Sequence, residues 1–114
     1  MPEITVRQPR AQGTVRLRVR DSARGSELAA LRQSGSLRAL FPRCDAKNLS
    51  VVLTNTSGGV TGGDRFFTEI TADQVAVLTL TNQAAERAYR AAPSEIGRIE
   101  NRLHVKSGAR INWL

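Results

Sequence analysis

The glycine-rich segment at residues 58–64 is the part of this sequence that most invites a chemical interpretation. It reads G-G-V-T-G-G-D and follows a short apolar run at residues 49–53. A phosphate-binding loop would need a Lys and a Ser or Thr after its last glycine, and a helix beginning there, to surround the anion with backbone N–H groups. Here Asp64 and Arg65 follow the glycines instead. We therefore interpret the four glycines as positions that need a positive φ or a close chain approach, namely Gly58, Gly59, Gly62 and Gly63.

Asp64 could pair with Arg65 or Arg87, or offer an oxygen ligand to a metal ion in transit. We favour pairing, because a lone carboxylate is a weak metal site. Transition metals are usually held by imidazole, thiolate and carboxylate groups together. The chain has one His and one Cys, sixty residues apart, His104 and Cys44. The sequence therefore predicts no stable metal site and no stably bound cofactor.

Catalytic arrangements find no support in the same residues. A Ser-His-Asp or Cys-His arrangement needs a buried, oriented histidine, whereas His104 lies in an alternating charged stretch and is expected to be exposed. Cys44 has no second cysteine for an internal disulfide, which agrees with a reducing compartment. We expect no enzymatic activity. We also expect a cytoplasmic protein, because residues 1–10 lack a secretory signal and no apolar run is long enough to span a membrane.

The basic charge is concentrated in the amino-terminal part of the chain. The net charge is +7, and residues 1–43 contain nine Arg against three acidic residues. Residues 14–20 read T-V-R-L-R-V-R, which places Arg16, Arg18 and Arg20 on one face of a strand and apolar residues on the other. We interpret the arginines as solvated charge that protects an edge strand. A surface for nucleic acid, an anionic membrane or an acidic protein remains the functional alternative.

Repeated alternation of apolar and polar residues predicts an all-β fold of mainly antiparallel strands, in stacked or coiled sheets that resemble a β-helix or a sandwich. A chain of 114 residues has room for one domain or part of one. Residues 65–71 and 75–81 are expected to be neighbouring antiparallel strands. Residues 84–92 are rich in alanine and could form a short helix, and residues 1–13 could be disordered. The expected strands are residues 14–20, 27–41 with a break at Ser34-Gly35-Ser36, 49–53, 65–71, 75–81, 98–106 and 109–114.

Three segments together resemble the opening half of urease accessory proteins of the UreD family, called UreH in some bacteria. They are L-R-Q-S-G-S-L-R at residues 31–38, L-T-N-T-S-G-G-V-T-G-G-D at residues 53–64, and T-N-Q-A-A-E-R-A-Y-R at residues 81–90 paired with G-A-R-I-N-W-L at residues 108–114. The glycine-rich segment is the most specific. The residues of these motifs that we single out are Gln33, Gly35, Gly58, Gly59, Gly62, Gly63, Asp64, Gln83, Tyr89, Arg90 and Trp113.

The resemblance implies a β-rich, non-enzymatic chaperone scaffold that assists nickel insertion into the urease active site. Its implied partners are the urease apoprotein and the accessory protein UreF, which recruits the GTPase UreG. Nickel is then a cargo in transit and not a resident cofactor. A small basic nucleic-acid-binding β module is the alternative, and it would need arginines interleaved with exposed aromatics. The aromatic residues lie outside the Arg-rich strand, so we do not expect nucleic acid as a partner.

The family pattern normally continues past the last matched segment into a P-Q-E motif and a second half, both absent from this sequence. We therefore interpret the chain as a single partial domain, either a fragment or a truncated gene product. A last strand at Trp113 and Leu114 would leave backbone groups unpaired and an apolar face uncovered. We expect the chain to be marginally stable alone or to associate with itself.

Overall fold

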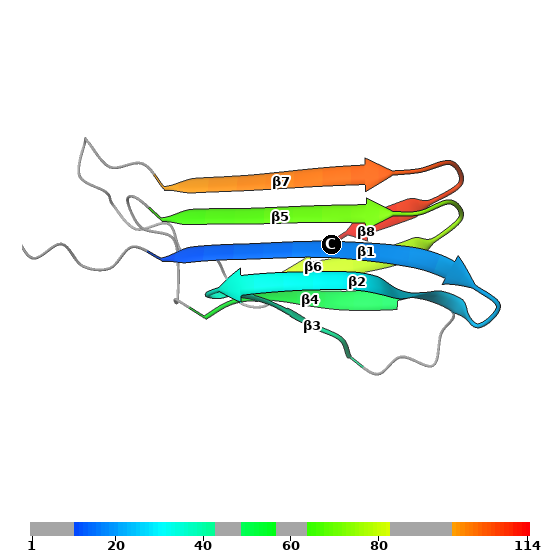
Figure 1. The fold of residues 1–114 in the computed structure, drawn as a ribbon, viewed down its shortest axis with the longest axis horizontal. Coiled ribbons are helices and arrows are strands. Elements are labelled where there is room, and N and C mark those ends of the chain that lie inside the picture. Colours follow the sequence, from blue (N-terminus) through cyan, green and yellow to red (C-terminus); the bar gives the residue numbers. More distant parts are fainter. Residues whose placement is uncertain (1–10, 43–48, 57–63, 83–96) are drawn as a thin grey trace, which may run out of the picture.

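The computed structural model describes residues 11–42, 49–56, 64–82 and 97–114, and every regular element in these ranges is a β-strand (Figure 1). The prediction of an all-β fold is therefore confirmed. The predicted helix at residues 84–92 lies outside the described residues. The strands are β1 Gln12–Ser22, β2 Gly25–Gly35, β3 Leu37–Leu40, β4 Leu49–Asn55, β5 Arg65–Ala72, β6 Val77–Asn82, β7 Arg98–Val105 and β8 Arg110–Trp113.

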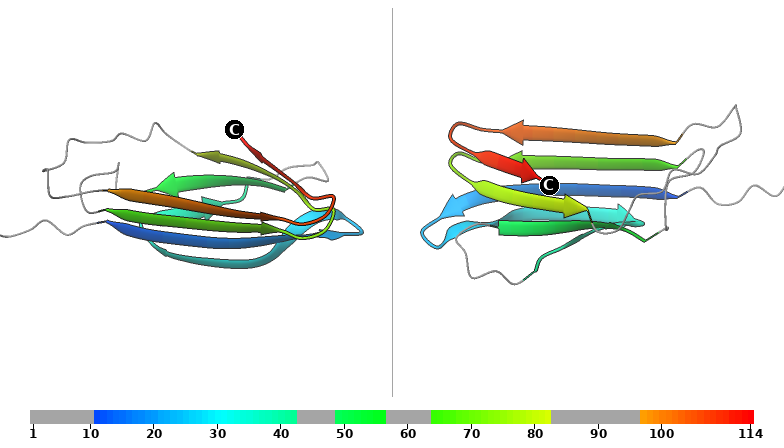
Figure 2. Two further views of the ribbon diagram at one scale, coloured as in Figure 1. Left: turned by 90° about the horizontal axis from the view of Figure 1, so that it is seen from above. Right: turned by 180° about the vertical axis from the view of Figure 1, so that it is seen from behind.

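The strands form two four-stranded sheets that face each other (Figure 2). Sheet A has the order β2-β1-β5-β7, and sheet B has the order β3-β4-β6-β8. From β4 onward the chain visits the two sheets alternately, and β6, β7 and β8 each lie beside the strand two places earlier in the chain. In this part of the chain the strands wind from one sheet to the other like the turns of a β-helix, which agrees with the β-helix-like form of the prediction.

The prediction of mainly antiparallel strands is wrong. Only the β1–β2 and β3–β4 pairs are antiparallel, whereas β1–β5, β4–β6, β5–β7 and β6–β8 are parallel. The expected hairpin of residues 65–71 and 75–81 does not form, because β5 and β6 lie in different sheets. The chain crosses to the opposite sheet, reverses, and then crosses back. Two successive strands in the same sheet therefore run in the same direction. Alternation of residue types reveals which face of a strand is buried, but it carries no information about that direction.

The turn between β5 and β6 makes this crossing from one layer to the other. Val75 lies in the turn with φ of 69°, an unusual conformation for a β-branched residue, and its backbone N–H donates to the carbonyl of Ser107 at 3.1 Å. Strand β6 therefore begins at Val77, two residues later than predicted. Strand β1 begins at Gln12, and Gly13 pairs with both Gly35 and Phe66, so residues 12 and 13 of the segment expected to be disordered are part of a strand. Residues 1–10 of that segment lie outside the described residues.

The core lies between the sheets and is built from the apolar positions that alternate along the strands. Val15, Leu17 and Val19 of β1 are buried as predicted, while the arginines between them are exposed. Each fully buried Val, Leu or Ile side chain contributes on the order of 1.5–3 kcal/mol. The remaining members of the buried cluster are Leu37, Ala39, Val51, Leu53, Ile70, Ala72, Ala76, Leu78 and Leu80.

Gly35 marks the break between β2 and β3, where the chain passes from sheet A to sheet B. Its φ is 69°, and a Cβ at this position would overlap the backbone carbonyl oxygen of Gln12. The next residue, Ser36, donates its N–H to the same carbonyl at 2.9 Å. The predicted break at Ser34-Gly35-Ser36 is confirmed, and it requires glycine for conformational and steric reasons together.

Strand β1 lies inside sheet A, between β2 and β5 (Figure 1). The interpretation of its arginines as protection for an edge strand is therefore wrong. The edges of this sheet are β2 and β7. Strand β7 forms close to its predicted bounds, but all of its residues are exposed, and the apolar side chains of Ile99, Leu103 and Val105 remain 49%, 44% and 50% exposed.

Candidate functional site

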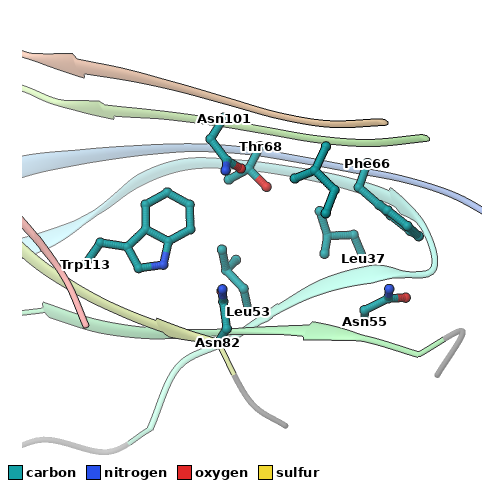
Figure 3. Close-up of a pocket in the computed structure, with 9 residues that line it drawn as sticks. Leu37, Leu53, Asn55, Phe66, Thr68, Asn82, Asn101 and Trp113 are labelled. Carbon is teal, nitrogen blue, oxygen red and sulfur yellow. The ribbon is translucent and has the colours of Figure 1, made fainter. Parts of the chain in front are cut away.

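A cavity of about 70 Å³ lies between the two sheets near β8 (Figure 3). It has room for a few water molecules, since one water needs about 10–15 Å³ of such space. Figure 3 shows Trp113 and Phe66 on opposite sides of it, with polar side chains between them. The cavity is lined by Leu37, Leu53, Asn55, Phe66, Thr68, Asn82, Ile99, Asn101 and Trp113.

The pairing of strands brings these residues together from distant parts of the sequence. In sheet A the parallel β5–β7 register places Thr68 beside Asn101. In sheet B the parallel β4–β6 register places Leu53 beside Asn82, and β8 adds Trp113 beside the buried Leu80. Of these residues only Trp113 was selected from the sequence. The asparagines were missed because their convergence depends on the parallel pairing.

The polar side-chain groups of the cavity are three asparagine amides, one threonine hydroxyl and the indole N–H of Trp113 (Figure 3). The amides and the hydroxyl belong to Asn55, Asn82, Asn101 and Thr68. Amides and hydroxyls donate and accept hydrogen bonds but do not titrate near neutral pH. They can hold water or a small polar solute, and they cannot supply a general acid, a general base or an anionic metal ligand. In the described ranges, no group of three or more His, Cys, Asp or Glu residues could hold a metal ion.

Asp64 lies where β1, β5 and β7 begin, and it is only 3% exposed. Its carboxylate accepts a hydrogen bond from the backbone N–H of Ala11 at 2.9 Å. Its backbone carbonyl accepts one from the backbone N–H of Arg98 at 2.8 Å. Arg65 is exposed and makes no ion pair in the part of the chain that the structure describes, so pairing of Asp64 with Arg65 is not found. Arg87, the other partner considered, lies outside that part. Asp64 thus ties the starts of three strands together.

Of the other motif residues, Gly35, Gln33 and Trp113 lie in the described ranges. Gln33 accepts a hydrogen bond from the backbone N–H of Ala39 at 3.0 Å, which links β2 to β3 near the break at Gly35. Trp113 lies in the cavity. The others fall outside the described residues, and they are Gly58, Gly59, Gly62, Gly63, Gln83, Tyr89 and Arg90.

His104 is exposed on β7, as predicted. Its Nε2 lies 3.2 Å from a carboxylate oxygen of Glu69 on the neighbouring strand β5. The contact lies on the outer face of sheet A, away from the cavity between the sheets. It gives the imidazole a partner that the sequence alone did not suggest.

The outer face of sheet A contains a group of residues that sequence reasoning missed. The ring of Phe67 on β5 lies between two guanidinium groups, with the central carbons of Arg16 on β1 and Arg102 on β7 at 5.5 and 5.6 Å from the ring centroid. Such distances are typical of cation–π contacts. The sequence placed every aromatic residue outside the Arg-rich strand, and the parallel β1–β5 pairing brings Phe67 beside it.

Asp73 forms ion pairs with two cations on the same face, Arg18 and Lys106. Arg18 donates from Nε and Nη2 to its two carboxylate oxygens at 2.9 Å each, and Lys106 Nζ lies 3.1 Å from Oδ1. The hydrogen bonds from Arg18 and then Lys106 lower the pKa of Asp73 from 3.8 to about 2. The same carboxylate raises the pKa of Arg18.

These features define a class of protein, a coiled two-sheet β protein whose described residues form neither a metal cluster nor a catalytic triad. The family model described as UreD urease accessory protein matches residues 11–114. The chain therefore belongs to the UreD family of urease accessory proteins.

Individual relatives agree with the family match. The chain is 52% identical over 89 residues to the urease accessory protein UreD of Ruegeria pomeroyi, which covers 78% of this chain and 35% of the relative. It is 45% identical over 107 residues to UreD of Roseobacter denitrificans, with 94% of this chain and 39% of the relative covered. For UreD of Bradyrhizobium diazoefficiens the identity is 46% over 105 residues, with 92% and 38% covered. The chain thus spans less than two fifths of the length of these relatives.

No helix in the described ranges has the length and apolar character that crossing a membrane would require.

Proposed function

We propose that this chain is part of a cytoplasmic scaffold that binds the urease apoprotein and UreF, with UreG joining through UreF, and that assists nickel insertion into urease. The observation that carries this proposal is the family match, which extends over residues 11–114 and therefore over all eight strands. The scaffold contributes binding surfaces, and nickel is the cargo of the assembly.

The chemistry of the described residues is compatible with this role. The cavity between the sheets offers neutral polar groups, and many charged side chains lie on the outer face of sheet A. A scaffold needs surfaces that recognise partners, and it needs no acid–base or nucleophilic group of its own. Asp64, which holds strands together through Ala11, has a structural role in addition to any contact with a passing metal ion.

Co-purification tests the proposal directly. The full-length gene that contains this sequence is co-expressed with the urease structural genes and UreF, and the tagged full-length protein is recovered from the soluble fraction. We expect the urease apoprotein and UreF to be retained together. Recovery of the tagged protein without either partner, under conditions in which all three are soluble, would contradict the proposal.

A further inference from the structure

Two pairs of arginines face each other across neighbouring strands on the outer face of sheet A. Arg16 of β1 is paired with Arg32 of β2, and Arg65 of β5 is paired with Arg98 of β7. All four side chains are exposed. Among the residues that the structure describes, none of the four has a carboxylate within 4.0 Å. Like charges placed directly opposite each other destabilise a sheet.

The other cations of this face have partners, which distinguishes these four. Arg18 and Lys106 bind Asp73, and Arg20 binds Glu27 at 2.8 Å. Arg102 binds Glu100 at 3.1 Å. The fold therefore neutralises part of the face and leaves two like-charged pairs that have no carboxylate partner among the described residues. These four arginines form the boundary of a defined area.

Phe67 lies within this area, with Thr14 as its register partner on β1. Two shallow depressions meet at Thr14. One, of about 450 Å³, is lined in part by Arg16 and Arg32, and the other, of about 470 Å³, by Arg65, Arg98 and the Phe67 ring. Arginine and the aromatic residues, Phe included, are enriched in protein–protein interfaces relative to the rest of the surface.

We propose that this area is the docking surface for an acidic segment of a partner protein, whose carboxylates neutralise the two arginine pairs. We call it the arginine face and define it by Arg16, Arg32, Arg65 and Arg98 around Phe67. The inference rests on the proposed function in one respect, that the partner belongs to the urease assembly. When carboxylates of the partner pair with these arginines, the repulsion within each arginine pair of the free protein is relieved. The partner is therefore attracted more strongly than it would be by four separate surface arginines.

An acidic protein fits this face better than a nucleic acid does. Glu69 and Glu100 lie among the arginines, beside Arg16 and Phe67 in the register, and would repel a continuous phosphate backbone. Stacking of bases needs accessible aromatic faces, whereas Phe67 is approached by guanidinium groups from both neighbouring strands. A protein can match such a mixed pattern with carboxylates and cations of its own.

The test removes one arginine from each pair in the full-length protein, in the double variant Arg32→Gln, Arg98→Gln. The matched control is Arg38→Gln, Arg110→Gln, which removes two exposed arginines from the outer face of sheet B with the same change in net charge. Dissociation constants for the urease apoprotein and for UreF are measured at low and at high salt. We expect the arginine-face variant to bind one of these partners at least about tenfold more weakly at low salt, with a smaller salt dependence, and the control to stay within about twofold.

Thermal unfolding of the same variants guards against a trivial loss of folding. The arginine-face variant should unfold at the same temperature as the wild type or at a higher one, because a repulsive pair has been relieved. Equal partner binding by wild type and arginine-face variant would overturn the inference and leave the proposed function intact. Displacement of the partner by duplex DNA, with loss of DNA binding in the same variant, would overturn it in favour of nucleic acid. Failure of the wild type to bind either partner would overturn the proposed function and the inference together.

Discussion

The carboxylate of Asp73 receives the guanidinium of Arg18 in a two-pronged contact, with Nε and Nη2 each 2.9 Å from a different oxygen. Arg18 belongs to β1, and Asp73 begins the turn that carries the chain from β5 to sheet B. The backbone N–H of Asp73 also donates to the carbonyl of Val19 at 2.9 Å. The contact therefore fixes the point at which the chain leaves sheet A.

Loss of the Asp73 carboxylate should weaken this connection. We expect Asp73→Asn to lower the midpoint of thermal unfolding by a few degrees, since exposed ion pairs contribute little even when their geometry is good. The difference from the wild type should shrink in 1 M salt, where the Debye length is about 3 Å. An unchanged midpoint at low salt would show that the contact contributes nothing to stability.

The same contact predicts a dependence of stability on pH. The pKa of Asp73 is lowered from 3.8 to about 2 in the folded protein, so its contribution is fully present above pH 3.8 and is lost as the pH falls toward 2. The difference in unfolding midpoint between the wild type and Asp73→Asn should therefore be constant near neutral pH and disappear below about pH 2. A difference that instead grows on acidification would contradict this assignment.

Gly35 should tolerate substitution less well than Gly108, which also has a positive φ. Gly35→Ala meets the carbonyl of Gln12, whereas Gly108→Ala has the same sign of φ but its nearest neighbour, Val75, at 3.7 Å. A residue other than glycine in this conformation costs about 1–3 kcal/mol in either position. We expect Gly35→Ala to lower the free energy of unfolding by at least about 1 kcal/mol more than Gly108→Ala. Urea denaturation of both variants measures the difference, and equal losses would mean that the crossing at Gly35 relaxes freely.

The half-exposed apolar residues of β7 predict the behaviour of the 114-residue chain alone. Leu103 and Val105 can be covered by a second copy, so we expect size-exclusion chromatography to show association that increases with concentration, or else weakly cooperative unfolding. Leu103→Lys with Val105→Lys should reduce the association. A compact monomer that unfolds cooperatively without these changes would contradict the prediction.

The sequence predicts the strands and their buried faces well, because burial repeats every second residue. The alternation of Val15, Leu17 and Val19 with arginines is observed, and so is the break at Gly35. The sequence does not predict whether neighbouring strands are parallel or antiparallel, because that depends on how the chain crosses between the two sheets. For this reason the sequence did not place Phe67 beside Arg16. The two residues are 51 positions apart in the chain, but the guanidinium carbon of Arg16 lies 5.5 Å from the centroid of the Phe67 ring.

The residues of the candidate site were likewise predicted only in part. Trp113 was selected through a family motif, whereas Asn82 lies in another quoted motif without being selected, and Asn101 lies in none. The contact of Asp64 is similarly hidden, because its hydrogen-bond donor is the backbone N–H of Ala11 and not a charged side chain. Backbone partners at long range depend on the fold and have no residue type that would reveal them.

The nickel content of urease is the measurement that tests the central claim most directly. Urease is purified from cells supplied with nickel that carry all the other urease genes, with or without the full-length gene that contains this sequence. The proposed role predicts nickel-loaded, active urease with the gene, and largely metal-free, inactive urease without it. Equal nickel content in the two preparations would contradict the account.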